Sequence, residues 1–189
     1  MISEIDQSLT LFLNGIHSPF FDRLMIWIST QEIWYLFYLF ILIYLGIKQR
    51  KGFLLSVFLI ALLITLADQT SSGFLKPMVK RLRPCHDPEI KEMIHNPNGC
   101  GGQYGFTSSH ASNHFAVAFF LFPLFRQRTK WAWLFFPWAI IISYSRIYLG
   151  VHYFGDIMIG ALIGAVFGVL VYKLGVFLSE KLKLKFRLD

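Results

Sequence analysis

The sequence has little charge. Charged residues make up 15% of its 189 residues, whereas hydrophobic residues make up 55% and phenylalanine alone occurs 20 times. A soluble domain carries about 25% charged residues. Internal repeats and low-complexity tracts are also missing. This composition argues against a soluble enzyme and predicts one integral membrane domain that covers residues 1–189.

The N-terminal segment lacks the basic region and apolar core of a cleaved signal peptide, so we expect the first true span to serve as its own insertion signal. Residues 2–12 are too short to cross a bilayer. Their apolar side chains recur at helical spacing, opposite acidic and amide side chains; the apolar set is Ile5, Leu9, Phe12 and Leu13. This pattern predicts an amphipathic helix that lies at the membrane interface.

Long apolar runs dominate the rest of the chain. A helix needs about 18 apolar residues or more to cross a bilayer, and five segments approach or exceed this length. They cover roughly residues 20–47, 52–68, 110–125, 131–148 and 154–178. We therefore expect an all-α fold, a polytopic transmembrane helix bundle of about five spans plus the N-terminal interfacial helix.

The net charge of +7 is concentrated beside these segments, in loops 48–51 and 126–130 and in the C-terminal KLKLKFRLD. Such basic clusters mark the cytoplasmic side and contact anionic lipid, and nucleic-acid binding is not supported. We expect a cytoplasmic C-terminus that is frayed against a bacterial inner membrane. Residues 73–109 and the turn around Gly150 would then face the periplasmic or extracellular side.

Both cysteines, Cys85 and Cys100, fall in this outer segment. A disulfide bond is permitted in such a compartment, where it would pin a loop rich in proline and glycine. Two free thiols, or a weak metal pair with His86 and His95, are the alternatives, because sequence alone does not show whether the two Cβ atoms meet.

Cationic side chains follow the second apolar run. In KPMVKRLRP, Lys76, Lys80 and Arg83 have the spacing of one helical face. Ammonium and guanidinium groups are good partners for phosphate oxygens. Taken alone, this stretch is equally consistent with a solvated basic loop that contacts lipid headgroups.

A polar run precedes the third apolar segment. Thr107-Ser108-Ser109-His110 is typical of a helix cap, and the free N–H groups at such a helix start form an anion site. His110 would stand beside a bound phosphate and protonate a leaving alkoxide. The alternative is a capped helix with a spectator histidine.

The third polar stretch is the most specific. Ser145-Arg146 ends one span, and His152 and Asp156 lie four apart at the start of the next, on one helical face. A carboxylate that accepts from the imidazole Nδ1–H leaves Nε2 free to attack, which makes His152 a candidate nucleophile. Because ionisable groups in membranes are costly, this role is favoured over a pair that merely joins two helices.

Together these stretches resemble the motifs of the type 2 phosphatidic acid phosphatase family, integral-membrane lipid phosphatases related to the vanadium haloperoxidases. The first motif, Lys–six residues–Arg-Pro, is matched from Lys76 to Arg83-Pro84. The third, Ser-Arg–five residues–His–three residues–Asp, is matched from Ser145 to Asp156. The second, Pro-Ser-Gly-His, is present with Thr107 for Pro and Ser109 for Gly. The resemblance covers about residues 50–175.

The resemblance implies a role for each motif residue. The phosphate-binding set is Lys76, Arg83, Ser108, Ser109 and Arg146. The catalytic set is His152 as nucleophile, Asp156 as the group that orients it, and His110 as general acid. No metal or other cofactor is implied, and no role falls to Lys80, Arg81 or His114.

We therefore expect an integral-membrane lipid phosphatase that hydrolyses a lipid phosphate or diphosphate ester through a phosphohistidine. The lipid bilayer and its lipid phosphates are the expected partners. Undecaprenyl diphosphate is the favoured substrate, and phosphatidylglycerol phosphate, phosphatidic acid and lipid A phosphate compete with it. The sequence does not set the oligomeric state.

Two other function classes remain open. The pairs His110–His114 and His152–Asp156 could hold zinc in a metal-dependent membrane hydrolase, although this leaves the cations at 76, 83 and 146 unexplained. A non-catalytic membrane protein that binds phosphate or phospholipid would use the same cationic pocket without turnover.

Overall fold

The computed structural model describes residues 2–188, and within that range the chain is helical, with one isolated β-bridge between Leu82 and Tyr104 and no strand. The α-helices are α1 (Ile2–Asn14), α2 (Pro19–Ser29), α3 (Tyr35–Gln49), α4 (Phe53–Asp68), α5 (Lys76–Val79), α6 (Ser109–Phe125), α7 (Phe135–Tyr148) and α8 (Phe154–Lys181). Shorter helical turns are η1 (Gln31–Trp34), η2 (Arg50–Gly52), η3 (Gln69–Leu75), η4 (Pro84–His86), η5 (Lys91–Met93) and η6 (Lys130–Leu134). The expected all-α class is confirmed.

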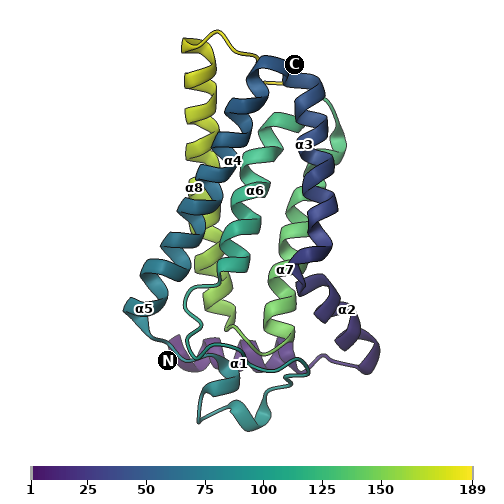
Figure 1. The fold of residues 1–189 in the computed structure, drawn as a ribbon. Helices are drawn as coiled ribbons and strands as arrows, with labels where there is room; N and C mark the ends of the chain where they lie inside the picture. The colour runs from purple at the N-terminus through teal and green to yellow at the C-terminus, as the bar shows by residue number, and fades with distance from the viewer. Residues whose placement is uncertain (1, 189) are drawn as a thin grey trace.

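Five long helices run side by side in a bundle, and α1 lies across one end of it (Figure 1). By length and composition, two continuous helical stretches among the described residues could cross a membrane, Gln31–Val79 and Phe154–Lys181. The first contains both α3 and α4, which turn back on each other at η2. The count of five spans therefore stays a prediction.

The expected first span, residues 20–47, is wrong as a single helix. Helix α2 ends at Ser29, and Thr30 has an extended backbone with φ −76° and ψ 122°. The polar run from Ser29 to Glu32 breaks the apolar stretch, so the chain changes direction before α3 begins.

Helices α6 and α8 approach each other so closely that their backbones touch. A Cβ atom added at Gly160 or Gly164 of α8 would overlap the carbonyl oxygens of Ser108 or Ser112, respectively, on α6. A four-residue spacing of small residues is the sequence pattern that lets two membrane helices meet at this range. Gly160 and Gly164 therefore determine how the start of α6 faces the start of α8.

This contact gives a stability prediction. Gly164→Ala should destabilise the fold by about 1–3 kcal/mol, because the added methyl group has no room against Ser112. Gly46→Ala is the matched control: its Cβ would make only ordinary contacts with Phe53, and alanine favours a helix. Thermal unfolding in detergent measures both. Equal melting temperatures for the two variants would contradict this account of the α6–α8 contact.

The C-terminal tail is not frayed, so that expectation is wrong. Phe186 and Leu188 are buried in the main apolar core. Gln49 donates a hydrogen bond to the Phe186 carbonyl oxygen, and Arg128 donates one to that of Leu188. The alternation of basic and apolar residues in the tail thus places the apolar ones inward, at the end of the bundle that carries loops 48–51 and 126–130 (Figure 1).

Candidate active site

All the candidate site residues lie at the end of the bundle opposite the basic loops, near α1 (Figure 1). The structure therefore shows the expected separation of basic loops from site residues, while which end faces the cytoplasm stays a prediction.

His152 lies in the turn before α8, not on the helix as expected, because α8 begins at Phe154. Its Nδ1 atom is 3.5 Å from Oδ2 of Asp156, and both side chains are almost fully buried. That distance is longer than a hydrogen bond, and among residues 2–188 this Nδ1 has no hydrogen-bond partner. Catalytic hydrogen bonds are often long before substrate binds and shorten in the complex. The backbone N–H of Tyr153 donates to the same Oδ2 at 3.0 Å, which caps α8 and holds the carboxylate.

The start of α6 adjoins this pair. Ser108 is the N-cap, its Oγ accepting from the Ala111 N–H at 3.4 Å, and its own N–H donates to the Asp156 carbonyl oxygen at 3.2 Å. Ser109 is the first residue of α6 and is half-buried. His110 follows on the same turn, within electrostatic range of His152.

His114 supports His110 from one turn further along α6. Its Nδ1 bonds the His110 carbonyl oxygen at 2.7 Å, and its Nε2 lies 3.3 Å from the Tyr38 hydroxyl on α3. The two imidazole rings are 6.3 Å apart between centroids. Both ring nitrogens of His114 thus contact the protein itself.

Lys76 lies at the junction between the π-helical segment η3 and the short helix α5. The seven-residue stretch η3 has π-helical hydrogen bonding and leads directly into α5, which Lys76 begins. π-Helical insertions are frequent at functional sites because they redirect side chains. Lys80 ends α5 in a left-handed conformation with φ 52° and is exposed. The expected helical alignment of Lys80 with Lys76 and Arg83 is therefore wrong.

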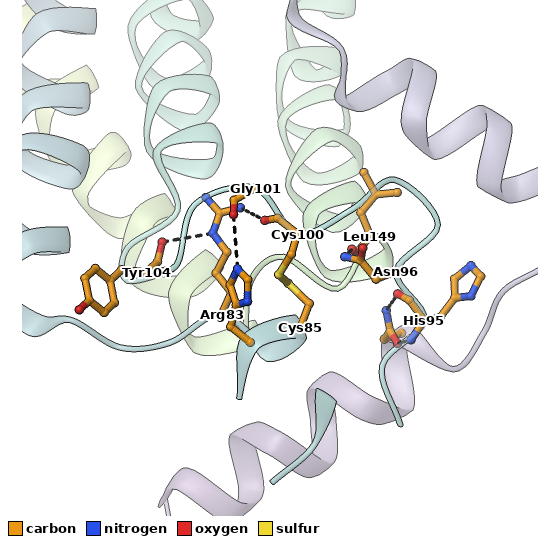
Figure 2. The surroundings of a disulfide bond; sticks show 10 residues. Arg83, Cys85, His95, Asn96, Cys100, Gly101, Tyr104 and Leu149 are labelled. Carbon is orange, nitrogen blue, oxygen red and sulfur yellow. Dashed lines mark hydrogen bonds between the residues drawn. A yellow bond between two sulfur atoms is a disulfide. The ribbon is translucent and has the colours of Figure 1, made fainter. Parts of the chain in front are cut away.

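Arg83 is held by backbone carbonyl groups of the long loop between α5 and α6. Its Nη1 donates to the Cys100 oxygen at 2.8 Å and its Nε donates to the Tyr104 oxygen at 3.2 Å (Figure 2). Cys100 is joined to Cys85 by a disulfide bond, one of the alternatives that the sequence left open. The disulfide bond therefore ties down the loop whose carbonyl groups orient Arg83.

Opening the disulfide bond tests this role. The double substitution Cys85→Ser, Cys100→Ser should lower the free energy of unfolding by about 3 kcal/mol, the chain-entropy value for a 15-residue loop. It should also release the Cys100 carbonyl group from Arg83. Chemical unfolding with and without reductant measures the first effect. Unfolding curves that coincide for the wild type and the double variant would contradict it.

Arg146 lies in the last turn of α7, and its side chain reaches α2. One of its Nη atoms donates to Ser29 Oγ on α2. Among residues 2–188, its Nε has no hydrogen-bond partner, and the buried Oγ1 of Thr107 has none either. A buried guanidinium N–H without a partner is suited to bind an oxyanion.

Three cations converge here with two carboxylates, and Asp68 acts on Lys76 as Asp156 does. Lys76 interacts electrostatically with Arg83, Arg146 and Asp156. Burial lowers the pKa of the Arg83 guanidinium, and Asp156 opposes this. Burial, with Arg146 and Arg83 nearby, lowers the pKa of His152 to about 4, even though Asp156 raises it. His152 is therefore a neutral imidazole at neutral pH, the form that a nucleophile needs.

The low pKa of His152 has a consequence for stability. An unfolded histidine titrates near 6.5, so between about pH 6.5 and 4 the unfolded chain binds the extra proton and stability falls as pH falls. His152→Gln should remove this contribution, which is on the order of 3 kcal/mol by pH 4. Melting temperatures of both proteins from pH 7 to 4 check it. Parallel curves would contradict the buried neutral imidazole.

Arg81 and Asp6 contact the site although sequence reasoning gave them no role. Arg81 lies between the carboxylates of Asp156 and Asp6, at 3.1 and 2.7 Å. The sequence feature that indicates this contact is the spacing of Asp6, Thr10 and Asn14, which places three polar side chains on one face of α1. The expected amphipathic helix is present, but this polar face packs on the protein, while Ile5 and Phe12 are exposed.

Within residues 2–188, no three or more histidine, cysteine, aspartate or glutamate side chains come close enough to hold a metal ion.

Comparison with known proteins places this geometry in a family. The profile of the PAP2 superfamily matches residues 53–179. The chain belongs to the PAP2 superfamily, and it is an enzyme, a membrane phosphatase that hydrolyses phosphoric esters of lipids.

Relatives of the chain include two lipid A 4′-phosphatases. The chain is 45% identical to the lipid A 4′-phosphatase of Bacteroides thetaiotaomicron over 100% of its length and 83% of the relative's. It is 35% identical to the lipid A 4′-phosphatase of Porphyromonas gingivalis over 91% of its length and 73% of the relative's. The bacitracin transport permease protein BcrC of Bacillus licheniformis is 40% identical, but over 35% of this chain and 32% of its own.

Solved structures share the fold. Aquifex aeolicus LpxE superposes with a TM-score of 0.69 at 24% identity, over 88% of this chain and 93% of that one. The PAP2-type phosphatidylglycerolphosphate phosphatase of Bacillus subtilis superposes with a TM-score of 0.64 at 23% identity, over 98% and 89%.

Proposed function

We propose that this protein hydrolyses the 4′-phosphate ester of lipid A. The observation that carries the proposal is the match to two lipid A 4′-phosphatases along nearly the whole chain, at 45% and 35% identity. Undecaprenyl diphosphate, favoured on sequence alone, has no comparable support, so lipid A phosphate replaces it as the preferred substrate.

His152 is the proposed nucleophile. With Nδ1 facing Asp156, its Nε2 carries the free electron pair. Nε2 attacks phosphorus, the N–P bond forms, and the bond from phosphorus to the sugar oxygen breaks. The leaving oxygen takes a proton from His110, whose imidazolium form the bound phosphate dianion favours, and departs as an alcohol. The product at this stage is a phosphohistidine.

Water completes the reaction. His110, now neutral, accepts a proton from a water molecule as its oxygen attacks phosphorus. The N–P bond breaks, and inorganic phosphate leaves with His152 neutral again. His114 holds the His110 backbone and packs against Trp138 with ring centroids 5.0 Å apart, which steadies this turn of α6.

The three convergent cations are the proposed phosphate clamp. Lys76, Arg83 and Arg146 stabilise the charge on the equatorial oxygens, which is the main demand of phosphoryl transfer. The N-terminus of α6 adds backbone N–H groups and the hydroxyl groups of Ser108 and Ser109. Serine at 109, where the family motif has glycine, supplies one hydroxyl more.

An apolar cavity beside this clamp can hold the hydrocarbon part of the substrate. A cavity of about 310 Å³ lies between α3, α4 and α6, and it is lined by Trp34, Tyr38, Leu63, His114, Phe120 and Leu121. His114 joins the cavity to the turn that bears His110. A lipid can therefore present its headgroup to the cations while a chain stays among apolar side chains. We place this end of the bundle on the periplasmic side, as the basic loops predict.

Phosphate release by detergent-purified protein tests the proposal. The panel holds lipid A, undecaprenyl diphosphate, phosphatidylglycerol phosphate and phosphatidic acid, each with excess EDTA, and mass spectrometry of the lipid A product locates the lost phosphate. We expect the highest kcat/KM on lipid A, loss of the 4′-phosphate, and at least a 10⁴-fold lower kcat for His152→Ala, on the order of the loss of other nucleophiles.

Other outcomes separate the alternatives. A preference for undecaprenyl diphosphate would overturn the lipid A assignment and leave the phosphatase mechanism standing. Release that EDTA abolishes would favour the metal-dependent hydrolase. Wild-type rates in His152→Ala, with a normal melting temperature, would overturn the nucleophile itself. His17→Ala, outside the cluster, is the control for loss of a histidine in general.

A further inference from the structure

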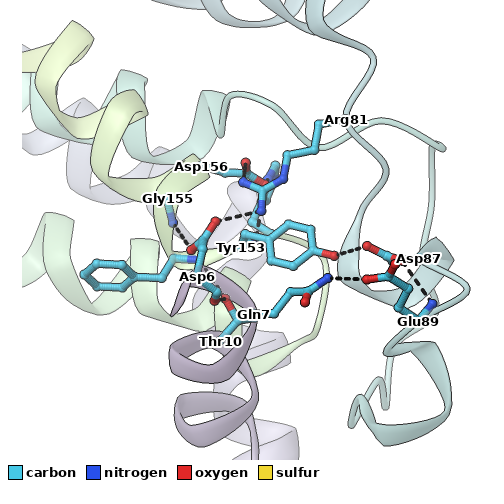
Figure 3. A network of polar contacts seen from close by, with 11 residues as sticks. Asp6, Gln7, Thr10, Arg81, Asp87, Glu89, Tyr153, Gly155 and Asp156 are labelled. Carbon is cyan, nitrogen blue, oxygen red and sulfur yellow. Dashed lines mark hydrogen bonds and ion pairs between the residues drawn. The ribbon is translucent and has the colours of Figure 1, made fainter. Parts of the chain in front are cut away.

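Arg81 bridges two carboxylates next to the catalytic pair. Its Nη1 donates to Asp156 Oδ1 at 3.1 Å, and its Nη2 donates to Asp6 Oδ2 at 2.7 Å (Figure 3). The guanidinium carbon lies 3.7 Å from the centroid of the Tyr153 ring. A guanidinium group that is stacked on a ring and bonded at two edges has little freedom to turn toward anything else.

Asp156 is bound at both of its oxygen atoms as a result. Oδ1 accepts from Arg81, and Oδ2 accepts from the Tyr153 N–H at 3.0 Å and faces His152 Nδ1. A carboxylate that is held at one oxygen alone can rotate about its Cβ–Cγ bond. The bond from Arg81 opposes this rotation, so it keeps the carboxylate plane oriented with one oxygen toward His152.

Helix α1 supplies the second half of this arrangement. Asp6 Oδ1 accepts from the Gly155 N–H at 2.7 Å, and Thr10 Oγ1 accepts from the Phe154 N–H at 3.0 Å (Figure 3). These are first-turn N–H groups of α8, so a distant helix caps α8 at the turn that carries Asp156. Asp6 thus holds both Arg81 and the helix start that Arg81 acts on.

We propose that Arg81 is a positioning residue for the reaction: anchored by Asp6, it fixes the Asp156 carboxylate so that Oδ2 stays against His152 Nδ1. The inference rests on the proposed role of His152 as nucleophile. Arg81 does not bind the phosphate, because Asp156 and Asp6 already occupy two of its donors and Tyr153 covers its face.

Steady-state kinetics of Arg81→Ala test the proposal, with Lys80→Ala as matched control. Lys80 is the adjacent cation, exposed and outside the site. We expect kcat of Arg81→Ala to fall about 10–100-fold, the cost of misplacing a catalytic group by about 1 Å, while KM stays unchanged. Lys80→Ala should keep both constants. The assay uses whichever panel lipid the wild type hydrolyses fastest, so failure of the lipid A assignment leaves this test intact.

Chemical rescue of Arg81→Ala distinguishes a positioning role of Arg81 from a purely structural one. Guanidinium ion at millimolar concentration, well below denaturing levels, should restore part of the kcat of Arg81→Ala and leave Lys80→Ala unaffected. Arg81→Lys should fall between the wild type and Arg81→Ala, because one ammonium group cannot bridge two carboxylates as the planar fork does. Asp6→Asn should lower kcat less than Arg81→Ala, and the double variant should be no slower than Arg81→Ala alone.

Three results would overturn the proposal. The first is an unchanged kcat in folded Arg81→Ala. The second is a rise in KM at constant kcat, which would make Arg81 a substrate contact. The third is a lowered melting temperature with lost activity that neither guanidinium nor Arg81→Lys restores, which would reduce the bridge to a structural ion pair.

Discussion

The close approach of α6 and α8 is the contact on which the rest of the structure depends. Glycine at positions 160 and 164 lets the two backbones touch, and at the end of that seam the Ser108 N–H meets the Asp156 carbonyl oxygen at 3.2 Å. Two helix starts, one bearing His110 and the other following His152, are thereby brought to one place. Side chains of larger size would separate them, and the proposed acid and nucleophile would no longer face one phosphate. The contact that stabilises the α6–α8 pair thus also determines the geometry of the site.

Helix α1 constrains the same site from outside the bundle. Its polar face meets the protein, as does Leu13 from its apolar set. Asn14 bonds the carbonyl oxygens of Ile147 and Tyr148 at the end of α7 and both backbone groups of His95 in the loop between α5 and α6. Exposed Ile5 and Phe12 point the other way. An interfacial helix usually keeps its polar face in water. Here the protein takes the place of water, so the position of α1 and the geometry of the α7–α8 turn are coupled.

The sequence predicted the helical class, the motif residues and their gathering at one end of the bundle. It failed where tertiary contacts override local pattern. Lys80 has helical spacing to Arg83, yet α5 stops at Val79 and Lys80 turns left-handed. The tail pattern around Phe186 looked like a frayed end, because nothing in it shows the carbonyl partners Gln49 and Arg128. Arg81 was missed for the same reason, since its partners lie 75 residues away on either side.

The basic residues around the site have two electrostatic roles: Arg81 neutralises carboxylate charge, and Lys76, Arg83 and Arg146 are left to bind phosphate. Asp6 and Asp156 together carry two negative charges, and Arg81 between them offsets one. Asp68, which acts on Lys76, supplies one more negative charge, but Lys76, Arg83 and Arg146 still carry more positive charge than the remaining carboxylate charge can balance. Like charges held together in a poorly solvated site repel one another, and a phosphate dianion relieves that repulsion. The site therefore gains from binding a doubly charged phosphate monoester headgroup. Arg81 contributes by keeping the orienting carboxylate from pairing with the clamp instead.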